Sequence, residues 1–281
     1  MPGRTPLMTT TLRPTEPLQR ETDGTRSRRY QVCVNSRPVG AIHLGTSPQF
    51  GDSVARILDL RIEEPDRRRG RGTVAALAAE EVARGWRCTR IEAAVPADAE
   101  AALKVATALG YVVRSRVMGK PLGDTPPALP EGSRGRSMTQ EEYGPWREHD
   151  IDMYAQSCVE RGVPEAEART MAEEGHAAVL PDGLATEGMV LNVLEREGTA
   201  VGTLWVGPRE GRAYVYAVDV DARHRGQGNG RTLMLLAEAQ GVAAGRTAIQ
   251  LNVFAGNTPA ERLYESLGYE PVTYHLYKNL L

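Results

Sequence analysis

The stretch VYAVDVDARHRGQGNGRTLM, residues 215–234, runs from an apolar strand-like segment through an arginine- and glycine-rich turn into an apolar helix. Glycines let the backbone turn tightly and leave the amides at the helix start uncovered. Together with the helix dipole, such amides form a site for a phosphate group. The stretch therefore predicts an anion site at a strand-to-helix turn.

The same element occurs a second time, 158 residues earlier in the chain. Six positions coincide at this offset without any insertion or deletion, which indicates an internal repeat. The earlier members are Arg67, Gly70, Gly72, Leu109, Gly110 and Tyr111, and the later ones are Arg225, Gly228, Gly230, Leu267, Gly268 and Tyr269.

Each copy has the pattern strand, helix, strand, helix, strand, which predicts an α/β fold with a mixed sheet. Hairpins before each turn, at 30–45 and 189–206, add antiparallel strands. In the second copy Thr258 is expected to cap the last helix, with Pro259 following it. The expected inner strands are 57–62, 90–95, 214–220 and 248–254.

The chain of 281 residues is long enough for two domains. Residues 121–137 are rich in proline and glycine and are expected to be a linker. We expect a disordered tail over residues 1–28, a first domain over 29–120 and a second over 138–281.

Composition narrows the class of protein. Hydrophobic residues make up 41% and charged residues 25%, as in soluble globular proteins. The 34 cationic and 36 acidic residues nearly balance, which argues against a nucleic-acid binder. No apolar run is long enough for a membrane helix or a signal peptide, so a cytoplasmic protein is expected. Cys33, Cys88 and Cys158 have neither disulfide-framework nor metal-site spacing, and no metal is expected.

Two other phosphate-binding motifs can be tested against the turn. Neither copy has the Gly-Lys-Ser/Thr of a P-loop. Gly70, Gly72 and Ala75, with Glu92 further on, match a dinucleotide-binding fingerprint, but residues 63–69 separate the strand from the first glycine. Both alternatives are therefore disfavoured.

The run at 215–234, with LNVFAGNTPAERLYESLGYEPV at 251–272 and YHLYKNL at 274–280, closely resembles the Gcn5-related N-acetyltransferase (GNAT) superfamily. The resemblance is strong over residues 190–281. It implies two tandem acyl-CoA N-acyltransferase domains, of which the first is degenerate. Such a tandem is similar in architecture to mycothiol synthase.

The resemblance also implies acetyl-CoA as the acyl donor, bound to the turn by its pyrophosphate and to the strands by its pantetheine arm. Asn257 matches a position that the family often uses near that arm. The expected cofactor-binding residues are Ala217, Val218, Val220, Arg225, Gly226, Gln227, Gly228, Asn229, Gly230, Arg231, Asn252, Asn257 and Tyr264.

Direct attack of a primary amine on the thioester is the reaction that the resemblance implies. Tyr264 matches the family's proton donor to the leaving thiolate, although it also has the helical spacing of a core residue beside Leu263 and Leu267. Asp219 is the nearest carboxylate by sequence and is the expected proton acceptor, with a solvated strand residue as the alternative.

The first copy departs from the family pattern, because it lacks the expected asparagines and tyrosine. It is also too short upstream of Arg67 for the two helices with which the family shapes the acceptor site. A scaffolding role is expected, and residual CoA binding stays open. The positions of Asn252, Asn257 and Tyr264 hold Ala94, Ala99 and Ala106 in the first copy.

Residues 138–190 carry 12 acidic residues against three arginines. Part of this charge belongs to the solvated faces of amphipathic helices. A negative field over the acceptor site would favour a cationic amine.

We therefore expect a cytoplasmic N-acetyltransferase that acts on a small-molecule amine. Two alternatives remain: a non-catalytic acyl-CoA-binding or regulatory module, and a transferase that uses another acyl-CoA. Neither nucleic acid nor membrane is an expected partner. A homodimer and an internal pseudo-dimer of the two copies are both open.

Overall fold

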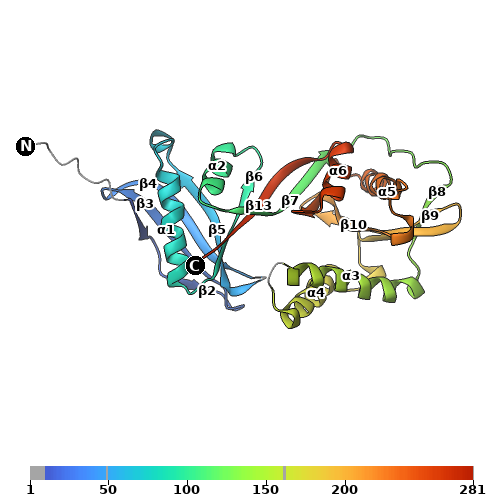
Figure 1. Ribbon diagram of the computed structural model, residues 1–281, viewed down its shortest axis with the longest axis horizontal. Helices are drawn as coiled ribbons and strands as arrows, with labels where there is room; N and C mark the ends of the chain where they lie inside the picture. Colours follow the sequence, from blue (N-terminus) through green and yellow to red (C-terminus); the bar gives the residue numbers. More distant parts are fainter. Residues whose placement is uncertain (1–9, 49, 161–162, 281) are drawn as a thin grey trace, which may run out of the picture. The chain divides into compact units, whose positions relative to one another are not determined.

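The computed structural model describes residues 10–48, 50–160 and 163–280 and divides into two compact units (Figure 1). The first unit comprises Met1–Arg116 and Pro271–Leu281, and the second comprises Val117–Glu270. Both units combine a mixed sheet with helices, which confirms the α/β class.

The first unit has the strand order β1-β3-β4-β5-β6-β13, with β2 beside β3. Only β5 and β6 are parallel within this set. Its elements are β1 (Thr10–Pro14), β2 (Gln19–Arg20), β3 (Arg26–Val34), β4 (Arg37–Ser47), β5 (Gly51–Ile62), η1 (Glu64–Asp66), α1 (Arg71–Gly85), β6 (Arg90–Pro96), α2 (Glu100–Ala108), the start of β7 (Val112–Pro121) and β13 (Glu270–Asn279).

Helix α1 packs closely on this sheet because small residues line its inner face. Ala75, Ala79 and Ala83 recur every four residues and are fully buried. They share one hydrophobic core with residues of the strands, among them Leu276 of β13. The last strand of the chain therefore belongs to the core of the first unit.

A polar row crosses three strands of the first unit. Arg29 of β3 is the register partner of His43 of β4, which in turn is the partner of Asp59 of β5. These residues line a hollow of about 300 Å³.

Among the described residues before η1 there are only strands, so the first copy lacks the helix pair, as the sequence predicts.

The second unit has the strand order β7-β12-β11-β10-β9-β8. Here β11 and β12 are the parallel pair, and β8 to β11 are antiparallel neighbours. Its further elements are β8 (Ser133–Ser137), α3 (Gln140–Glu160), α4 (Glu165–Val179), η2 (Gly183–Ala185), β9 (Val190–Arg196), β10 (Thr199–Arg209), β11 (Arg212–Val220), η3 (Ala222–His224), α5 (Asn229–Ala243), β12 (Ala248–Phe254) and α6 (Thr258–Ser266).

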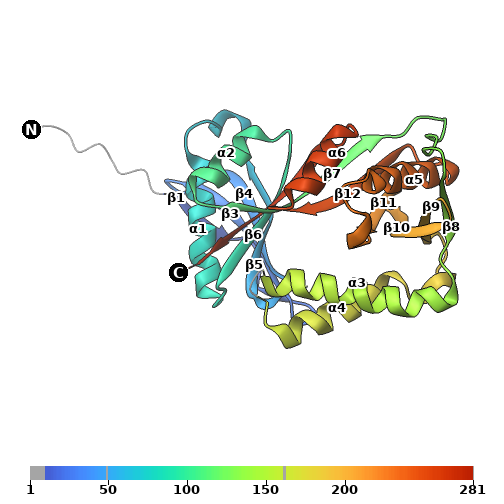
Figure 2. The same ribbon diagram turned by 45° about the vertical axis from the view of Figure 1, so that its right-hand side comes forward.

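Helices cover both faces of the second sheet. One hydrophobic cluster joins the strands to α5 and α6 and includes Leu233 and Tyr264. The other joins them to the α3–α4 side and includes Trp146 and Trp205. Figure 2 shows α5 on one side of these strands and α3 with α4 on the other. The second unit is therefore a three-layer α/β structure.

The two copies exchange their closing strands. Strand β13 ends the second copy in sequence, yet it pairs with β6 of the first unit, where Leu276 is the partner of Ala93. Strand β7 ends the first copy, yet its second half lies next to β12 in the second unit. Met118 of β7 is fully buried in the core there. Each unit thus needs a strand from the other copy.

A buried ion pair secures each exchanged strand. Lys120 Nζ of β7 lies 3.0 Å from Glu238 Oε1 of α5, and Lys278 Nζ of β13 lies 2.7 Å from Glu80 Oε2 of α1. The two pairs are related by the repeat offset, because Lys120 and Glu80 each precede their counterparts by 158 residues. The carboxylate side chains are only 6% and 2% exposed.

A tyrosine completes each cluster. Lys120 Nζ lies 5.4 Å from the centre of the Tyr269 ring, and Lys278 Nζ lies 5.8 Å from that of Tyr111, both within cation–π range. Burial, together with the neighbouring negative charge of Glu80, raises the pKa of Tyr111. Burial and Glu238 raise the pKa of Tyr269 in the same way.

Two expected boundaries are wrong. Residues 10–28, expected to be disordered, contain β1, β2 and the start of β3, while residues 1–9 lie outside the described part. The expected linker over 121–137 ends in β8, which pairs with β9. Strand exchange also makes the units differ from the expected domains, since β13 leaves the second one.

The three cysteines are free and buried.

Replacing Lys120 with methionine should lower the free energy of unfolding by about 3 kcal/mol, because it leaves the Glu238 carboxylate buried without its partner. Adding Glu238→Gln to that variant should recover part of the loss. Lys104→Met is the matched control, since Lys104 and its partner Glu100 are 79% and 78% exposed. It should stay within about 0.5 kcal/mol of the wild type in urea denaturation. Equal losses in the two lysine variants would contradict the role of the buried pair.

Candidate active site

The second sheet opens between its two parallel strands. Pairing of β11 with β12 ends where Val215 faces Leu251, although β11 continues to Val220 and β12 to Phe254. Ala217, Val218 and Val220 therefore lie beyond the last parallel pair. The edge of β11 that faces away from β10 is left without a strand partner from β12 there.

A glycine keeps β11 attached to β10 while it leaves β12. Gly202 of β10 is the register partner of Val220, and a Cβ at Gly202 would collide with the carbonyl oxygen of Asp219. No larger residue fits this approach. In the first copy a Cβ at Gly40 of β4 would likewise collide with the carbonyl oxygen of Arg61. The parallel pairing of β5 with β6 there ends at Ile57 and Ala93. Both copies thus keep the opening.

The turn after β11 presents the start of α5. Gly226 and Gly228 have φ angles of 74° and 85°, a left-handed conformation that suits glycine. Helix α5 then begins at Asn229, and no side chain caps its first amides. Those amides and the helix dipole give this turn the character of an anion site. Gly70 before α1 has the same conformation.

Side chains of the turn brace it from within. Arg225 Nε donates to the carbonyl oxygen of Val220 at 3.0 Å, and Asn229 Nδ2 donates to that of His224 at 2.9 Å. Arg231 reaches Ser266 Oγ of α6 at 2.6 Å. Asn229 is buried, so its side chain serves to brace the turn. The carbonyl oxygen of Gln227 accepts from Arg196 at 3.1 Å.

Helix α6 approaches the same opening from the other strand. A Cβ at Gly230 would lie 3.2 Å from Leu263 Cδ2 and 3.9 Å from Val220 Cγ2, so the start of α5 meets the second half of α6 beside β11. Tyr264 is 6% exposed in this core, and burial raises its pKa to about 12. Asn252 lies on β12 and is half-buried.

Asn257, not Thr258, caps α6. Its Oδ1 accepts from the backbone N–H of Ala260 at 3.3 Å, and the helix begins at Thr258 with Pro259 in the next position. The prediction that Thr258 is the cap is wrong by one residue. Asn257 is exposed at the same end of β12 as Asn252. The structure thus places both asparagines along one segment.

Asp219 points to the opposite face of the sheet, towards α3. Its Oδ2 lies 3.3 Å from His149 Nε2, and its Oδ1 lies 3.5 Å from the Arg225 guanidinium. The side chain of Asp219 is 45% exposed. Arg225 therefore links the carboxylate to the turn, and the structure brings the expected proton acceptor to the edge of the opening.

Sequence reasoning missed Asp150, the neighbour of His149. Its side chain is 24% exposed, and Asp150 Oδ2 lies 3.7 Å from His176 Nε2 of α4. Burial raises the pKa of Asp150 to about 6, with a smaller contribution from the charge of Asp219 and an opposing one from His149. Burial likewise lowers the pKa of His176 to about 4. The spacing of Trp146 and Asp150, one helical turn apart, was the available signal for an inward face.

Aromatic rings surround His176. Its ring centre lies 5.5 Å from that of Trp146 and 5.1 Å from that of Trp205, and Trp205 stacks on Tyr216 at 4.8 Å. This layer joins α3 and α4 to β10 and β11. It accounts for the desolvation of His176.

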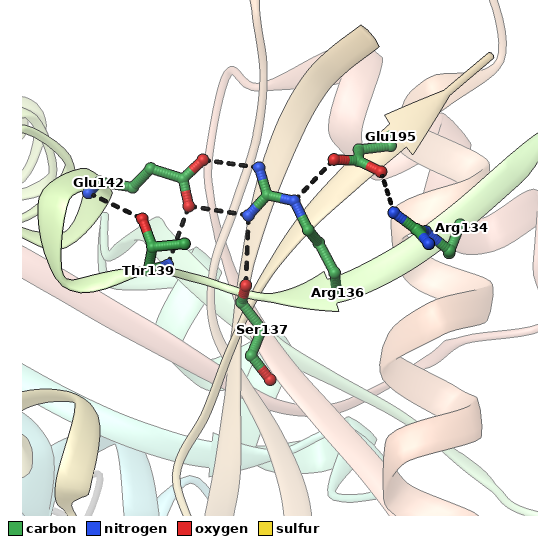
Figure 3. A network of polar contacts seen from close by, with 6 residues as sticks. All are labelled: Arg134, Arg136, Ser137, Thr139, Glu142 and Glu195. Atoms are coloured by element: carbon green, nitrogen blue, oxygen red, sulfur yellow. Dashed lines mark hydrogen bonds and ion pairs between the residues drawn. The ribbon is translucent and has the colours of Figure 1, made fainter. Parts of the chain in front are cut away.

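An ion-pair network fixes the start of α3 (Figure 3). The Arg136 guanidinium bonds both oxygens of Glu142 at 2.6 and 2.8 Å and Glu195 Oε1 at 2.6 Å. Thr139 Oγ1 accepts from the Glu142 N–H, and Glu142 Oε2 accepts from the Thr139 N–H, which is a capping box. Arg136 lowers the pKa of Glu142 to about 2. The start of α3 is thus tied to β8 and β9.

Two kinds of feature are absent from the described residues. No group of three or more histidine, cysteine or carboxylate side chains in that part of the chain is arranged to hold a metal ion. Likewise, none of the helices there is both long and apolar enough to cross a membrane.

A sequence model of the acetyltransferase (GNAT) family matches residues 6–111 and 151–269, one match in each copy. Mycothiol acetyltransferases are among the relatives. That of Thermomonospora curvata is 31% identical over 87% of this chain and 79% of its own length. That of Thermobispora bispora is 33% identical over 72% of this chain and 68% of its own length.

Solved structures show the same fold. A GCN5-related N-acetyltransferase from Sphaerobacter thermophilus superposes with a TM-score of 0.58 at 20% identity, over 90% of this chain and 80% of its own. A tandem GNAT protein from the clavulanic acid biosynthesis pathway has a TM-score of 0.51 at 21% identity, over 92% and 84%. At these identities the likeness concerns the fold alone.

Asp150→Asn should stabilise the protein at pH 7 by about 1–3 kcal/mol and have little effect at pH 4. The folded-state pKa of Asp150 lies near 6, above its ordinary value of 3.8, so the wild type loses stability as the pH rises through that interval. Asparagine does not titrate and escapes the loss.

Thermal unfolding at the two pH values measures this difference. Asp152→Asn is the control from the same helix, since the Asp152 side chain is 59% exposed, and it should not stabilise the protein. An Asp150→Asn variant that is destabilised equally at both pH values would contradict the half-buried, charged carboxylate.

Proposed function

Because this chain belongs to the acetyltransferase (GNAT) family, we propose that its second copy transfers an acetyl group from acetyl-CoA to a primary amine of a small molecule. The observation that carries the proposal is the opening between β11 and β12, which lies directly before an uncapped helix start. The first feature suits an extended pantetheine arm, and the second suits a pyrophosphate.

The donor would be held by backbone groups first. The amides at the start of α5, from Asn229 to Arg231, are proposed to bind the pyrophosphate, with Arg225 and Gly226 to Gly228 shaping the turn. Asn252 and Asn257 would contact the pantetheine arm. A backbone amide of the segment Ala217–Val220 would donate to the oxyanion that forms on the thioester carbonyl.

Tyr264 is the proposed proton donor to the leaving thiolate. Its raised pKa, about 12, keeps the phenol protonated at neutral pH, as a donor must be. Its burial in the cluster against which Val218 and Val220 of β11 pack supports this role. A free thiol has a pKa of about 8.5, so the departing sulfur is a good leaving group and gains further from the proton.

Asp219 is the proposed proton acceptor for the ammonium. The freed amine attacks the thioester carbon, the new C–N bond forms and the C–S bond breaks. Of the two protons that the nitrogen loses, one reaches Asp219 and then solvent. The other, carried by water, replaces the proton that Tyr264 gives to sulfur.

The relatives named mycothiol acetyltransferases support a small-molecule acceptor. For the first copy we propose a structural role. It keeps the opening and the turn but has alanines in place of the tyrosine and both asparagines, and it supplies β7 to the second unit. A cytoplasmic location, and a homodimer or pseudo-dimer, stay predictions.

Tyr264→Phe should lower kcat by about 100-fold while leaving the affinity for acetyl-CoA nearly unchanged, because only the proton donor is removed. Transfer can be followed as CoA thiol release with a panel of primary amines. Tyr277→Phe is the matched control, since the Tyr277 ring packs under Arg90 in the first unit. Unchanged kcat in Tyr264→Phe would rule out this residue as the donor, and no turnover with any amine would favour a binding module.

A further inference from the structure

Two carboxylates from different elements, Asp219 of β11 and Asp150 of α3, each lie next to a histidine of the α3–α4 layer. Asp219 bonds His149 at 3.3 Å, and the charges of both residues act on Asp150. The side chains of Asp219 and Asp150 are 45% and 24% exposed, so a solute can reach both. The strand and the helix thus carry negative charge on the same side of the sheet, close enough for one carboxylate to affect the other.

The two carboxylates differ in how their charge is balanced. Asp219 has Arg225 at 3.5 Å and His149 at 3.3 Å. Among the described residues, no lysine or arginine forms an ion pair with Asp150, whose neighbour at 3.7 Å is His176. The lowered pKa of His176 keeps that ring neutral at pH 7. Ionised Asp150 is therefore short of a cation.

His176 is a second sign of an incomplete site. Its side chain is 4% exposed, and in the described part of the chain neither ring nitrogen has a hydrogen-bond partner. An unpartnered buried polar group costs about 1–3 kcal/mol. Trp146 and Trp205 hold the ring so that Nε2 faces Asp150. From there Nε2–H can donate to one oxygen of an ionised Asp150 and leave the other oxygen for a second donor.

We propose that Asp150 and Asp219 together bind the ammonium group of the acceptor, with Asp150 as the residue that selects a cationic primary amine. An ammonium has three donors, which two carboxylates can share, and such charge-assisted bonds are the strong ones. The inference rests on the proposed function, in which Asp219 then accepts the proton.

The site should work only when Asp150 is ionised. The groups that face it are His149 on its own helix, Asp219 on β11 and His176 on α4, with Arg147 near His176 and Arg225 on Asp219. Lowering the pH through about 6 protonates Asp150 and removes its charge. Amine affinity should therefore fall below that pH in the wild type.

The test is a titration of the full-length protein, saturated with CoA, with spermidine, L-lysine and D-glucosamine as probes. The chain has five histidines, so the ring-proton NMR signal of His149 can be followed individually. We expect at least one probe to shift that signal at pH 7.5. Asp150→Asn should bind it about tenfold more weakly or worse. Asp152→Asn should bind it as the wild type does.

The same titration at pH 5.5 separates charge from shape. Other groups nearby also respond to pH, so the decisive quantity is the ratio of affinities between the wild type and Asp150→Asn. That ratio should shrink at pH 5.5. Because Asp150→Asn is expected to be the more stable protein at pH 7, thermal unfolding shows that a loss of binding is no loss of folding.

Equal amine affinity in the wild type and in Asp150→Asn would overturn the inference. The inference would also fail if none of the three amine probes bound to the CoA-saturated protein. Calorimetry with acetyl-CoA on the same sample separates the two proposals. Acetyl-CoA binding without any amine effect leaves the proposed function standing and removes the ammonium site. Amine binding that depends on Asp150, without acetyl-CoA binding, supports the ammonium site and counts against the proposed function.

Discussion

The geometry of the candidate site depends on the close approach of Gly202 to the carbonyl oxygen of Asp219. Because this glycine lets β10 stay paired as far as Val220, β11 can separate from β12 beyond Val215 without losing its other neighbour. The separation exposes one strand edge and aims the following turn at it. Helices α5 and α6 then pack against that edge from one face, and α3 packs on the other.

The first copy keeps this backbone arrangement but lacks the polar side chains that the second copy has at the opening. The opening is preserved, because Gly40 has the same close approach and the parallel pairing of β5 with β6 ends early. The turn is preserved as well, with Gly70 in the left-handed conformation. Alanines replace the side chains that would act there. Exchange of β7 and β13 gives a physical reason for its retention. Each unit completes its sheet with the other copy's strand, and a lysine of that strand neutralises a buried glutamate.

The sequence was sufficient for the α/β class and the glycine turn, because both depend on neighbours within a few residues. It was also sufficient for the repeat, because six positions coincide at one constant offset of 158 residues. The cap of α6 was predicted one position late because Asn257 and Thr258 are both good caps. Strands β1 and β2 and the exchange of β13 were missed, since pairing with a distant edge leaves little trace in the pairing segment itself. Asp150 was lost among the acidic residues of α3, most of which face solvent.

The proposed function depends on binding of acetyl-CoA by the second copy at the turn before α5. Calorimetric titration of the wild type, Gly228→Asp and Gly70→Asp with acetyl-CoA tests it directly. Both glycines precede a helix with φ angles of 71° and 85° and open space around them, so aspartate strains the two turns alike and Gly70→Asp controls for that strain. Thermal unfolding checks that both variants stay folded. The account predicts binding to the wild type and to Gly70→Asp, and at least about tenfold weaker binding to Gly228→Asp, whose carboxylate would repel the pyrophosphate. No binding to the wild type, or unchanged affinity in Gly228→Asp, would contradict it.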